Sequence, residues 1–286
     1  MSAQPVAAND AVTRPPLKYY GGKAGHRWQL ADWIISHFPP HAHYIEPFAG
    51  GMSVLLRKEP SRLETANDLD GDLVTFFRVL RERTDELVRA IELTPFAHAE
   101  HDLSYTPAAD DLERARRLYV RSWQGRGGGR GSWRSGWRRT KNPYQARPIE
   151  AWQTVDQLYA IAARLRQVQI ECDDALNVIC RYDRPDALFY VDPPYLAETR
   201  GRWAKTGYAV ELNENSHRQL ADALRSVRGM VILSGYPSDL YSDLYSDWRT
   251  EMRQSRADGG LARTEVLWLN PAAADGRRQP RLLEVL

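Results

Sequence analysis

Cysteine is scarce in this sequence, and its histidines lack the spacing of a metal site. Among 286 residues there are two cysteines, Cys172 and Cys180, and seven histidines. Two cysteines without metal-like companions argue against a disulfide or metal framework and favour a reduced, cytoplasmic protein. We therefore expect no bound metal.

Long uncharged apolar runs are also missing. The opening residues, MSAQPVAANDAVTRPP, contain no apolar core of a secretion signal. No later segment combines the length and hydrophobicity needed to cross a bilayer. We expect neither export nor membrane insertion, and we expect residues 1–14 to form a loose leader.

Acidic residues are almost absent from one part of the chain. The segment from Leu112 to Arg147 contains eleven lysines and arginines and a single acid, Glu113. The remaining chain carries 28 basic and 36 acidic residues. Within this segment, residues 121–139 read RSWQGRGGGRGSWRSGWRR, with three tryptophans and almost no aliphatic side chains. A basic segment on an otherwise acidic chain indicates a surface that faces a polyanion. The tryptophans favour nucleic acid over a merely solvated charged loop.

Hydrophobic patterning outside this segment predicts alternating strands and helices. Such alternation indicates an α/β fold with a mostly parallel sheet, which binds ligands at the carboxyl ends of its strands. Residues 79–150 differ in composition and are expected to be an insertion into a larger domain formed by residues 15–78 and 151–286. Expected strands lie within 42–51, 62–70, 167–172, 187–192, 229–235 and 264–270, and expected helices cover 72–93, 152–166 and 216–227.

The stretch FYVDPPY joins an apolar strand to an aspartate, two prolines and a tyrosine. Proline fixes φ and donates no hydrogen bond, so Pro193 and Pro194 hold the backbone rigid and aim a carbonyl into the cleft. Asp192 and the Pro193 carbonyl then provide two acceptors for the two hydrogens of one amino group. Tyr195 supplies a flat face for stacking. The motif predicts a pocket for an exocyclic amine on a planar ring.

Together with five other segments, this motif resembles the Dam-type (D12 class) DNA adenine-N6 methyltransferases, which carry Asp-Pro-Pro-Tyr after a strand. The segments occur in the family's order: PLKYYGGK (16–23), YIEPFAGG (44–51), NDLDGDLVTFF (67–77), IECDDALNVI (170–179) and, after the motif, TEVLWLN (264–270). The resemblance implies a Rossmann-like class I methyltransferase fold with a seven-stranded, mostly parallel sheet. It also implies that S-adenosylmethionine is the methyl donor and that the acceptor is N6 of an adenine flipped out of duplex DNA.

The resemblance assigns roles to residues that match the family motifs. The expected catalytic residues are Asp192, Pro193, Pro194 and Tyr195. Glycines after the first strand would let the backbone approach the cofactor, and an acid after the second strand would bind the ribose hydroxyls. Two positions depart from the family pattern, since Tyr19 replaces a tryptophan and Asp70 replaces an asparagine. The residues expected to bind the cofactor are Tyr19, Lys23, Glu46, Phe48, Ala49, Gly50, Gly51, Asp68, Asp174 and Asp192.

The basic segment falls where the family has its target-recognition region. Residues 79–150 are therefore expected to form an inserted DNA-recognition domain with a hairpin. Segments 120–130 and 140–144 match the family's hairpin only in part, so the resemblance extends to the region and not to its base specificity. Basic side chains there would contact phosphates or guanines. The expected DNA-binding residues are Arg121, Trp123, Arg126, Arg130, Arg134, Arg138, Arg139 and Lys141.

Two alternatives remain open. An RNA adenine-N6 methyltransferase would use the same pocket, and a non-catalytic nucleic-acid-binding protein would use the insertion on a methyltransferase scaffold. The intact DPPY and EPFAGG motifs, together with Asp68, argue against the second alternative. We expect a nucleoid-associated enzyme that is monomeric in solution and dimerises at most transiently on duplex DNA. The motifs do not encode the recognition sequence, nor whether the enzyme serves restriction–modification, a phage or a housekeeping role.

Overall fold

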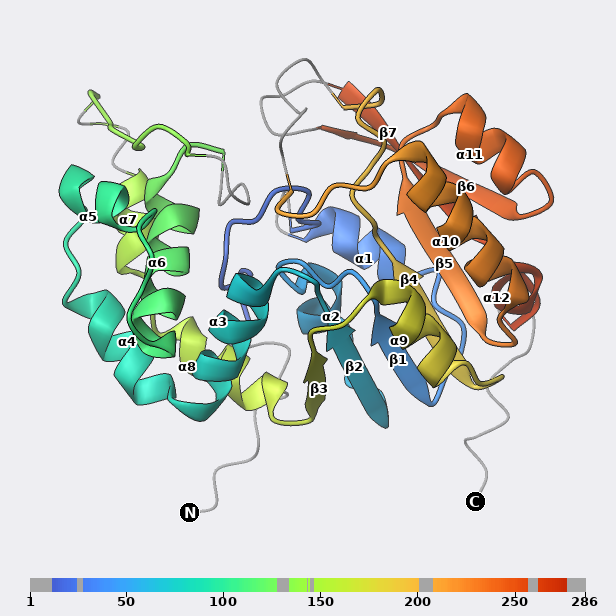
Figure 1. Cartoon of the computed structure of the whole chain (residues 1–286), viewed down its shortest axis with the longest axis horizontal. Helices are drawn as coiled ribbons and strands as arrows, with labels where there is room; N and C mark the ends of the chain where they lie inside the picture. Colours follow the sequence, from blue (N-terminus) through green and yellow to red (C-terminus); the bar gives the residue numbers. More distant parts are fainter. Residues whose placement is uncertain are drawn as a thin grey trace.

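A seven-stranded sheet forms the centre of the computed structural model, which describes residues 12–24, 28–127, 134–142, 144, 147–200, 208–256 and 262–276. The strand order is β3-β2-β1-β4-β5-β7-β6 (Figure 1). The first five strands in this order run parallel, and β7 is antiparallel to both β5 and β6. The expected class I methyltransferase fold is thereby confirmed. The strands are β1 (His43–Glu46), β2 (Leu63–Asn67), β3 (Val168–Glu171), β4 (Ala187–Val191), β5 (Met230–Gly235), β6 (Arg249–Arg256) and β7 (Ala262–Leu269).

The inner strands consist of buried residues. Every position of β1 (HYIE), β4 (ALFYV) and β5 (MVILSG) is buried, as expected for parallel strands with helices on both faces. In contrast, β6 has the polar sequence RTEMRQSR, and it pairs with β7 from Arg249 opposite Leu269 to Arg256 opposite Ala262. The sequence pattern therefore predicts every strand except β6. Strand β6 forms because it pairs with β7, and its own sequence is not hydrophobic.

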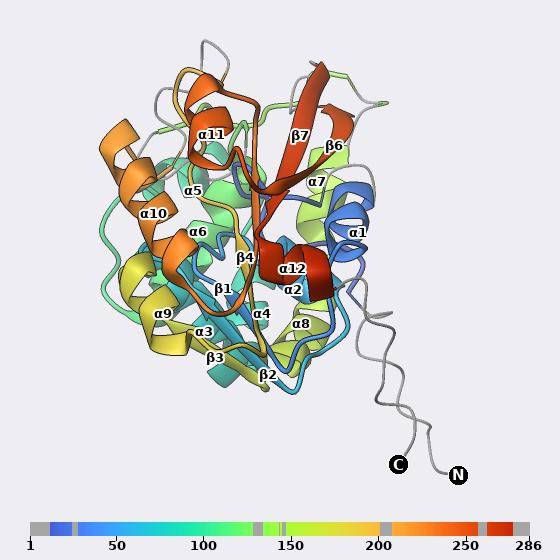
Figure 2. The same cartoon turned by 90° about the vertical axis from the view of Figure 1, so that its right-hand side faces the viewer.

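Short helices cover the two faces of the sheet, as Figures 1 and 2 show. One face is covered by α9 (Ala175–Tyr182), α10 (Glu214–Ser226) and α11 (Asp239–Leu244). The other is covered by α1 (Gln29–Ile35), α2 (Ser53–Arg57) and α12 (Pro271–Gly276). Neither face is therefore left open, and ligands have access at the ends of the strands.

The remaining helices gather beside the β3 edge of the sheet (Figure 1). They are α3 (Gly71–Glu82), α4 (Thr84–Glu92), α5 (His98–Leu103), α6 (Asp111–Gln124), α7 (Arg147–Gln153) and α8 (Gln157–Leu165). Two helices that were expected to be continuous are each interrupted in the structure. Helix 72–93 is interrupted at Arg83, which has φ −132° and ψ 44°, and helix 152–166 is interrupted between α7 and α8. Helical spacing continues across both breaks, so the pattern alone did not reveal them.

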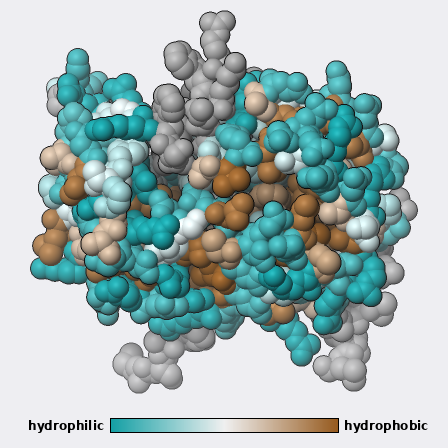
Figure 3. Space-filling view, viewed as in Figure 1, coloured by the Kyte–Doolittle hydropathy of each residue, from teal (hydrophilic) through white to brown (hydrophobic). Residues whose placement is uncertain are grey.

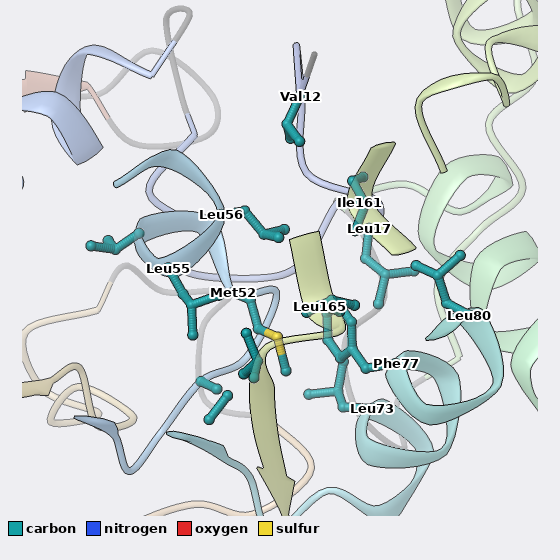
Figure 4. Packing of buried hydrophobic residues seen from close by; sticks show 14 of the residues in the cluster. Val12, Leu17, Met52, Leu55, Leu56, Leu73, Phe77, Leu80, Ile161 and Leu165 are labelled. Atoms are coloured by element: carbon teal, nitrogen blue, oxygen red, sulfur yellow. The ribbon is translucent and has the colours of Figure 1, made fainter. Parts of the chain in front are cut away.

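These helices share one hydrophobic core with the sheet. Leu73, Phe77 and Leu80 of α3 pack with Ile161 and Leu165 of α8 (Figure 4), and the same cluster includes buried side chains of α2, β1 and β4. Helix α6 contacts α3, α4, α5 and α7 and so links most of these helices. The region predicted as an insertion is thus continuous with the sheet in its packing.

The first described residues belong to the fold. Residues 12–14 were expected in the leader, but Val12 is 3% exposed and Thr13 donates a hydrogen bond to Gln157. The guanidinium of Arg14 donates to the Ala151 carbonyl. Residues 1–11 lie outside the described residues. Within the part that the structure describes, no helix has the length and apolarity to span a membrane.

Candidate active site

The Asp-Pro-Pro-Tyr motif begins one residue after β4, at the carboxyl end of the sheet. The side chain of Asp192 is 19% exposed. Its Oδ1 atom lies 2.8 Å from Nζ of Lys23 and accepts a 2.8 Å hydrogen bond from the hydroxyl of Ser234 on β5. Among the described residues no donor reaches Oδ2. One carboxylate oxygen is therefore held by the protein, and the other remains available to a substrate donor.

Lys23 lies between two acids, the half-buried Asp192 and the buried Glu265. Its Nζ atom is 2.8 Å from Asp192 Oδ1 and 3.4 Å from Glu265 Oε1, and it donates a 2.6 Å hydrogen bond to the Tyr195 hydroxyl. Burial by itself lowers the pKa of Lys23, but the Asp192 and Glu265 carboxylates outweigh it and raise this pKa well above its usual value. Lys23 is therefore a permanent cation beneath the motif.

Tyr195 is a buried member of this cluster, with 5% of its surface exposed. Its hydroxyl donates a 2.5 Å hydrogen bond to Glu265. The ring of Tyr236 meets the Tyr195 ring edge-on, with centroids 4.7 Å apart. The Nζ atom of Lys23 lies 4.6 Å from the ring centroid. The ring that was expected to stack on a base is thus fixed at its tip and along its side.

Sequence reasoning missed Glu265 and Ser234. Glu265 lies in β7 and is 2% exposed, and burial raises its pKa above the usual value. The available signal was an acid within the otherwise apolar strand TEVLWLN, where only charge partners would make its burial tolerable. Ser234 gave no signal, since a serine near the end of a strand is ordinary.

A glycine turn follows β1 and contacts the acid at the end of β2. Gly50 has φ 48°, a left-handed conformation that glycine adopts without strain. Its N–H donates a 2.8 Å hydrogen bond to Asp68 Oδ2, and the N–H of Asp70 donates to Oδ1. Burial raises the pKa of Asp68 to about 6. Each carboxylate oxygen accepts one backbone hydrogen bond and keeps a lone pair for a ligand hydroxyl.

One pocket connects this turn with the catalytic motif. Asp174, which caps α9 by accepting from the Leu176 N–H, lies on its wall, and Leu69 and Val210 add exposed apolar surface. Figure 3 shows the molecule from the same side as Figure 1, with hydrophobic side chains near the middle and mainly hydrophilic surface on either side. Every residue expected to bind the cofactor lines this pocket: Tyr19, Lys23, Glu46, Phe48, Ala49, Gly50, Gly51, Asp68, Asp174 and Asp192, together with Pro194 of the motif.

Tyr208, Val210 and Leu212 also line the pocket, and none of them was among the residues expected to bind the cofactor. The hydroxyl of Tyr208 approaches Gly21 so closely that a Cβ at this glycine would collide with it, and Gly21 has φ 78°. Arg200 forms a 2.5 Å ion pair with Glu211 and holds this segment. A contact of this kind depends on the fold, because nearly two hundred positions separate Gly21 from Tyr208.

The base of the expected hairpin is present in the basic segment. Gly125 and Trp137 form an antiparallel bridge, and the N–H of Arg138 donates to the Gln124 carbonyl. A groove beside it is lined by Trp137 and Tyr144, and Tyr144 is 95% exposed. The predicted DNA contacts in this groove are Arg126, Arg138, Arg139 and Lys141.

Three other predicted DNA contacts have partners within the protein. Trp123 is 8% exposed, and its indole N–H donates a 2.8 Å hydrogen bond to the Pro16 carbonyl, so it packs the fold. Arg121 pairs with Asp72 at 2.7 Å, and Arg134 pairs with Asp102 at 2.5 Å. Arg130 lies outside the described residues.

A single group among the described side chains has the composition of a metal site, namely His98, His101 and Asp102. Its carboxylate is bound by Arg134, and the indole ring of Trp137 stacks on His98 with centroids 5.3 Å apart. The ion pair engages Asp102 and the ring contact covers His98, whereas neither buried ring nitrogen of His101 has a hydrogen-bond partner among the described residues.

Amino-group methyltransferases of class I combine this strand order with an Asp-Pro-Pro-Tyr turn after β4, and the protein falls in that class. More narrowly, the chain belongs to the D12 class N6 adenine-specific DNA methyltransferases, whose family model matches residues 19–257. The expected activity, methylation of adenine in DNA, is thereby confirmed. A DNA adenine methylase from Salmonella typhi is 28% identical over 239 residues, and one from Escherichia coli K12 is 27% identical; each match covers 78% of this chain and 81% of the relative.

Similarity to solved structures is weaker. A SAM-dependent methyltransferase from Agrobacterium tumefaciens gives a TM-score of 0.39 at 12% identity, covering 87% of this chain and 62% of that one. An rRNA methylase from Streptococcus thermophilus gives a TM-score of 0.31 at 8% identity, covering 84% and 93%. Scores of this size carry no weight beside the family match.

Proposed function

We propose that this enzyme binds S-adenosylmethionine in the pocket between the β1 glycine turn and Asp192, and methylates N6 of a specific adenine flipped out of duplex DNA. One observation carries the proposal. Asp192 lies at the end of a pocket that begins at Asp68, with Oδ1 held by Lys23 and Ser234 and Oδ2 available. An acceptor in this position suits an amino group delivered opposite the methyl donor.

The pocket residues fit the proposed cofactor. Gly50 and Gly51 have no side chains between the backbone and the ligand, and a Cβ at either would lie 3.3–3.5 Å from Tyr19. Asp68 can accept hydrogen bonds from the ribose hydroxyls, and the apolar side chains of Phe48 and Leu69 can cover an adenine ring. When bound, S-adenosylmethionine supplies an electrophilic methyl group.

The residues of the motif would prepare the target nitrogen. The N6 lone pair of adenine is delocalised into its ring and is a poor nucleophile. Hydrogen bonds from the amino group to Asp192 Oδ2 and the Pro193 carbonyl would favour a pyramidal nitrogen with a directed lone pair. Catalysis would come from positioning and electrostatics, because neither a metal nor a covalent intermediate is needed.

Duplex DNA would be held by the basic groove beside α6. Arg126, Arg138, Arg139 and Lys141 line it and can neutralise phosphates. Flipping the adenine costs a few kcal/mol, which stacking near Tyr195 would offset. We expect the enzyme to act as a monomer in the cytoplasm at the nucleoid, where bacterial relatives named DNA adenine methylase would find their substrate.

Replacing the motif aspartate tests the proposal. Asp192→Ala should lower methyl transfer at least about 100-fold, since it removes the acceptor for the amino group. Cofactor affinity, measured by calorimetry, should survive at least in part. Asp186→Asn is the matched control, because this exposed acid precedes the opposite end of β4, and its activity should equal that of the wild type.

The substrate is identified by incubating the wild type with labelled S-adenosylmethionine and either duplex DNA or RNA, followed by nucleoside analysis. N6-methyladenine in DNA supports the proposal. Labelled RNA alone would instead support the RNA enzyme, and full turnover by Asp192→Ala would contradict the assigned role.

A further inference from the structure

Glu265 reaches the catalytic cluster from a distant part of the chain. It lies on β7, 70 positions beyond Tyr195 in the sequence, yet its Oε1 atom accepts the 2.5 Å hydrogen bond from the Tyr195 hydroxyl. The same oxygen lies 3.4 Å from Nζ of Lys23, and the Glu265 side chain is only 3% exposed. Burying a carboxylate is costly unless cations and hydrogen-bond donors surround it. The presence of a buried carboxylate at this position therefore needs an explanation other than packing.

The first consequence of this placement concerns charge. Lys23 is the one basic side chain that the described structure places against both Asp192 and Glu265. If the Glu265 charge were removed, Lys23 would pair with Asp192 alone and withdraw more electron density from that carboxylate. Asp192 would then be a weaker acceptor for a substrate amino group.

The second consequence concerns orientation. The Tyr195 hydroxyl accepts from Lys23 at 2.6 Å and donates to Glu265, so both of its hydrogen-bonding roles are used. Tyr236 supports the ring from the side. The direction of the ring is thus set at its tip by Glu265 and Lys23. Holding groups in place before the substrate arrives removes a reorganisation cost from the reaction.

We propose that Glu265 is a positioning residue for methyl transfer. It shares Lys23 with Asp192 and fixes the tip of Tyr195, so that Asp192 Oδ2 and the tyrosine ring are preset for the adenine. This inference rests on the function proposed above and adds to it a residue from outside the Asp-Pro-Pro-Tyr motif. Glu265 itself touches neither the pocket nor the reacting atoms.

The test compares kcat with cofactor binding in the full-length enzyme. Glu265→Gln keeps the shape and an acceptor oxygen but removes the charge. It should lower kcat for unmethylated genomic DNA about 10- to 100-fold, as expected when hydrogen bonds to a charged acceptor are replaced by weaker ones to a neutral acceptor. The KM for S-adenosylmethionine and its calorimetric Kd should stay within about twofold of the wild type. Glu265→Asp restores the charge and should recover part of kcat.

A double-mutant cycle separates positioning from general damage. If Glu265 acts through Tyr195, the losses from Glu265→Gln and Tyr195→Phe should not add. Glu251→Gln is the matched control: it neutralises a glutamate on the neighbouring strand, where Glu251 pairs with Arg249, and should retain wild-type kcat.

Several outcomes would overturn the inference. They are a wild-type kcat in Glu265→Gln, additive losses in the cycle, or a fall in cofactor affinity as large as the fall in kcat. If Glu265→Gln does not fold, Glu265→Asp and Tyr195→Phe replace it. A wild-type kcat in Glu265→Asp would show that the carboxylate need not be held at the Tyr195 hydroxyl, and an unchanged kcat in Tyr195→Phe, which removes the same hydrogen bond from the other side, refutes the fixing of the tyrosine by Glu265. Absence of methyl transfer by the wild type would instead refute the proposed function, so the two failures are distinguishable.

Discussion

Individual buried acids set the electrostatics of the active site. Glu46, the last residue of β1, is 2% exposed and accepts a 2.7 Å hydrogen bond from the Tyr44 hydroxyl. Burial raises its pKa to about 8, and the nearby Asp192 carboxylate contributes to the rise. At neutral pH Glu46 therefore holds a proton. The pocket consequently carries less negative charge than its acids alone would imply.

Glu46 should make the protein less stable as pH rises. In the unfolded chain this carboxyl ionises near the usual glutamate pKa of 4.5, whereas the folded protein retains the proton up to about pH 8. The folded state binds more protons in this window, so the free energy of unfolding decreases with pH through it. Glu46→Gln cannot ionise and lacks this decrease.

Urea denaturation without ligands, at about pH 5 and about pH 9, checks this prediction. The free energy of unfolding of the wild type should fall relative to Glu46→Gln by more than about 1.4 kcal/mol, the equivalent of one pKa unit. Parallel pH profiles for the two proteins would show that Glu46 is not held neutral.

At the level of elements, α6 and the segment after it divide the basic residues into two groups. Arg114 and Arg121 of α6 both bind Asp72 of α3, at 2.5 and 2.7 Å. Trp123, in the last turn of α6, is buried. Only after Gly125 do the arginines turn toward the open groove. The helix therefore anchors the segment, and the residues that follow it present the charge.

Removing charge from the groove should weaken DNA binding in a salt-dependent way. The triple variant Arg126→Gln, Arg138→Gln, Arg139→Gln should bind duplex DNA less tightly. The slope of log affinity against log salt should become shallower by about 0.9 for each arginine that contacts a phosphate.

Fluorescence anisotropy from about 50 to about 200 mM salt measures this slope. The matched control neutralises three arginines on α10 and the loop after it, namely Arg218, Arg225 and Arg228, which pair with Glu214, Asp247 and Asp183. The control should keep the wild-type slope. An unchanged slope in the groove variant would contradict the assignment of these residues to DNA.

Across the whole molecule, a buried ion cluster ties the sheet to the helices beside it. Glu64 of β2 is 1% exposed and binds Lys58 at 2.6 Å. Both of its oxygens also accept from Arg164 of α8, and Arg164 donates in turn to the Leu55 carbonyl of α2. Each charge in the cluster depends on the others, because a lone buried charge is strongly unfavourable.

Neutralising the centre of this cluster should destabilise the protein severely. Glu64→Gln leaves two buried cations without their counter-charge and should lower the free energy of unfolding by about 3–5 kcal/mol. Asp32→Asn removes the exposed pair with Arg57 and should cost at most about 1 kcal/mol. Chemical denaturation measures the free energy of unfolding of the two variants. Similar losses of this free energy would contradict the conclusion that the buried Glu64 cluster stabilises the fold.

Much of the fold and the core of the site could be predicted because their signals are local. The apolar runs of β4 and β5 reveal buried strands wherever they occur. The turn at Asp192 and the glycines after β1 follow their strands directly in sequence. Parallel strands place such turns at one edge of the sheet, so the residues expected to bind the cofactor converge on one pocket.

Only the tertiary structure decided which oxygen of Asp192 is free, and that Glu265 supports Tyr195. It also showed that Trp123 is buried and donates a hydrogen bond to the Pro16 carbonyl, whereas its arginine-rich setting had predicted a DNA contact. Composition reports what a segment could bind but not which of its side chains face inward. Contacts across such distances in the chain depend on how strands and helices pack, and no local pattern encodes them. By itself, the sequence determined the class of chemistry, through its motifs and their order, and the packing of distant strands decided which side chains surround the reacting group.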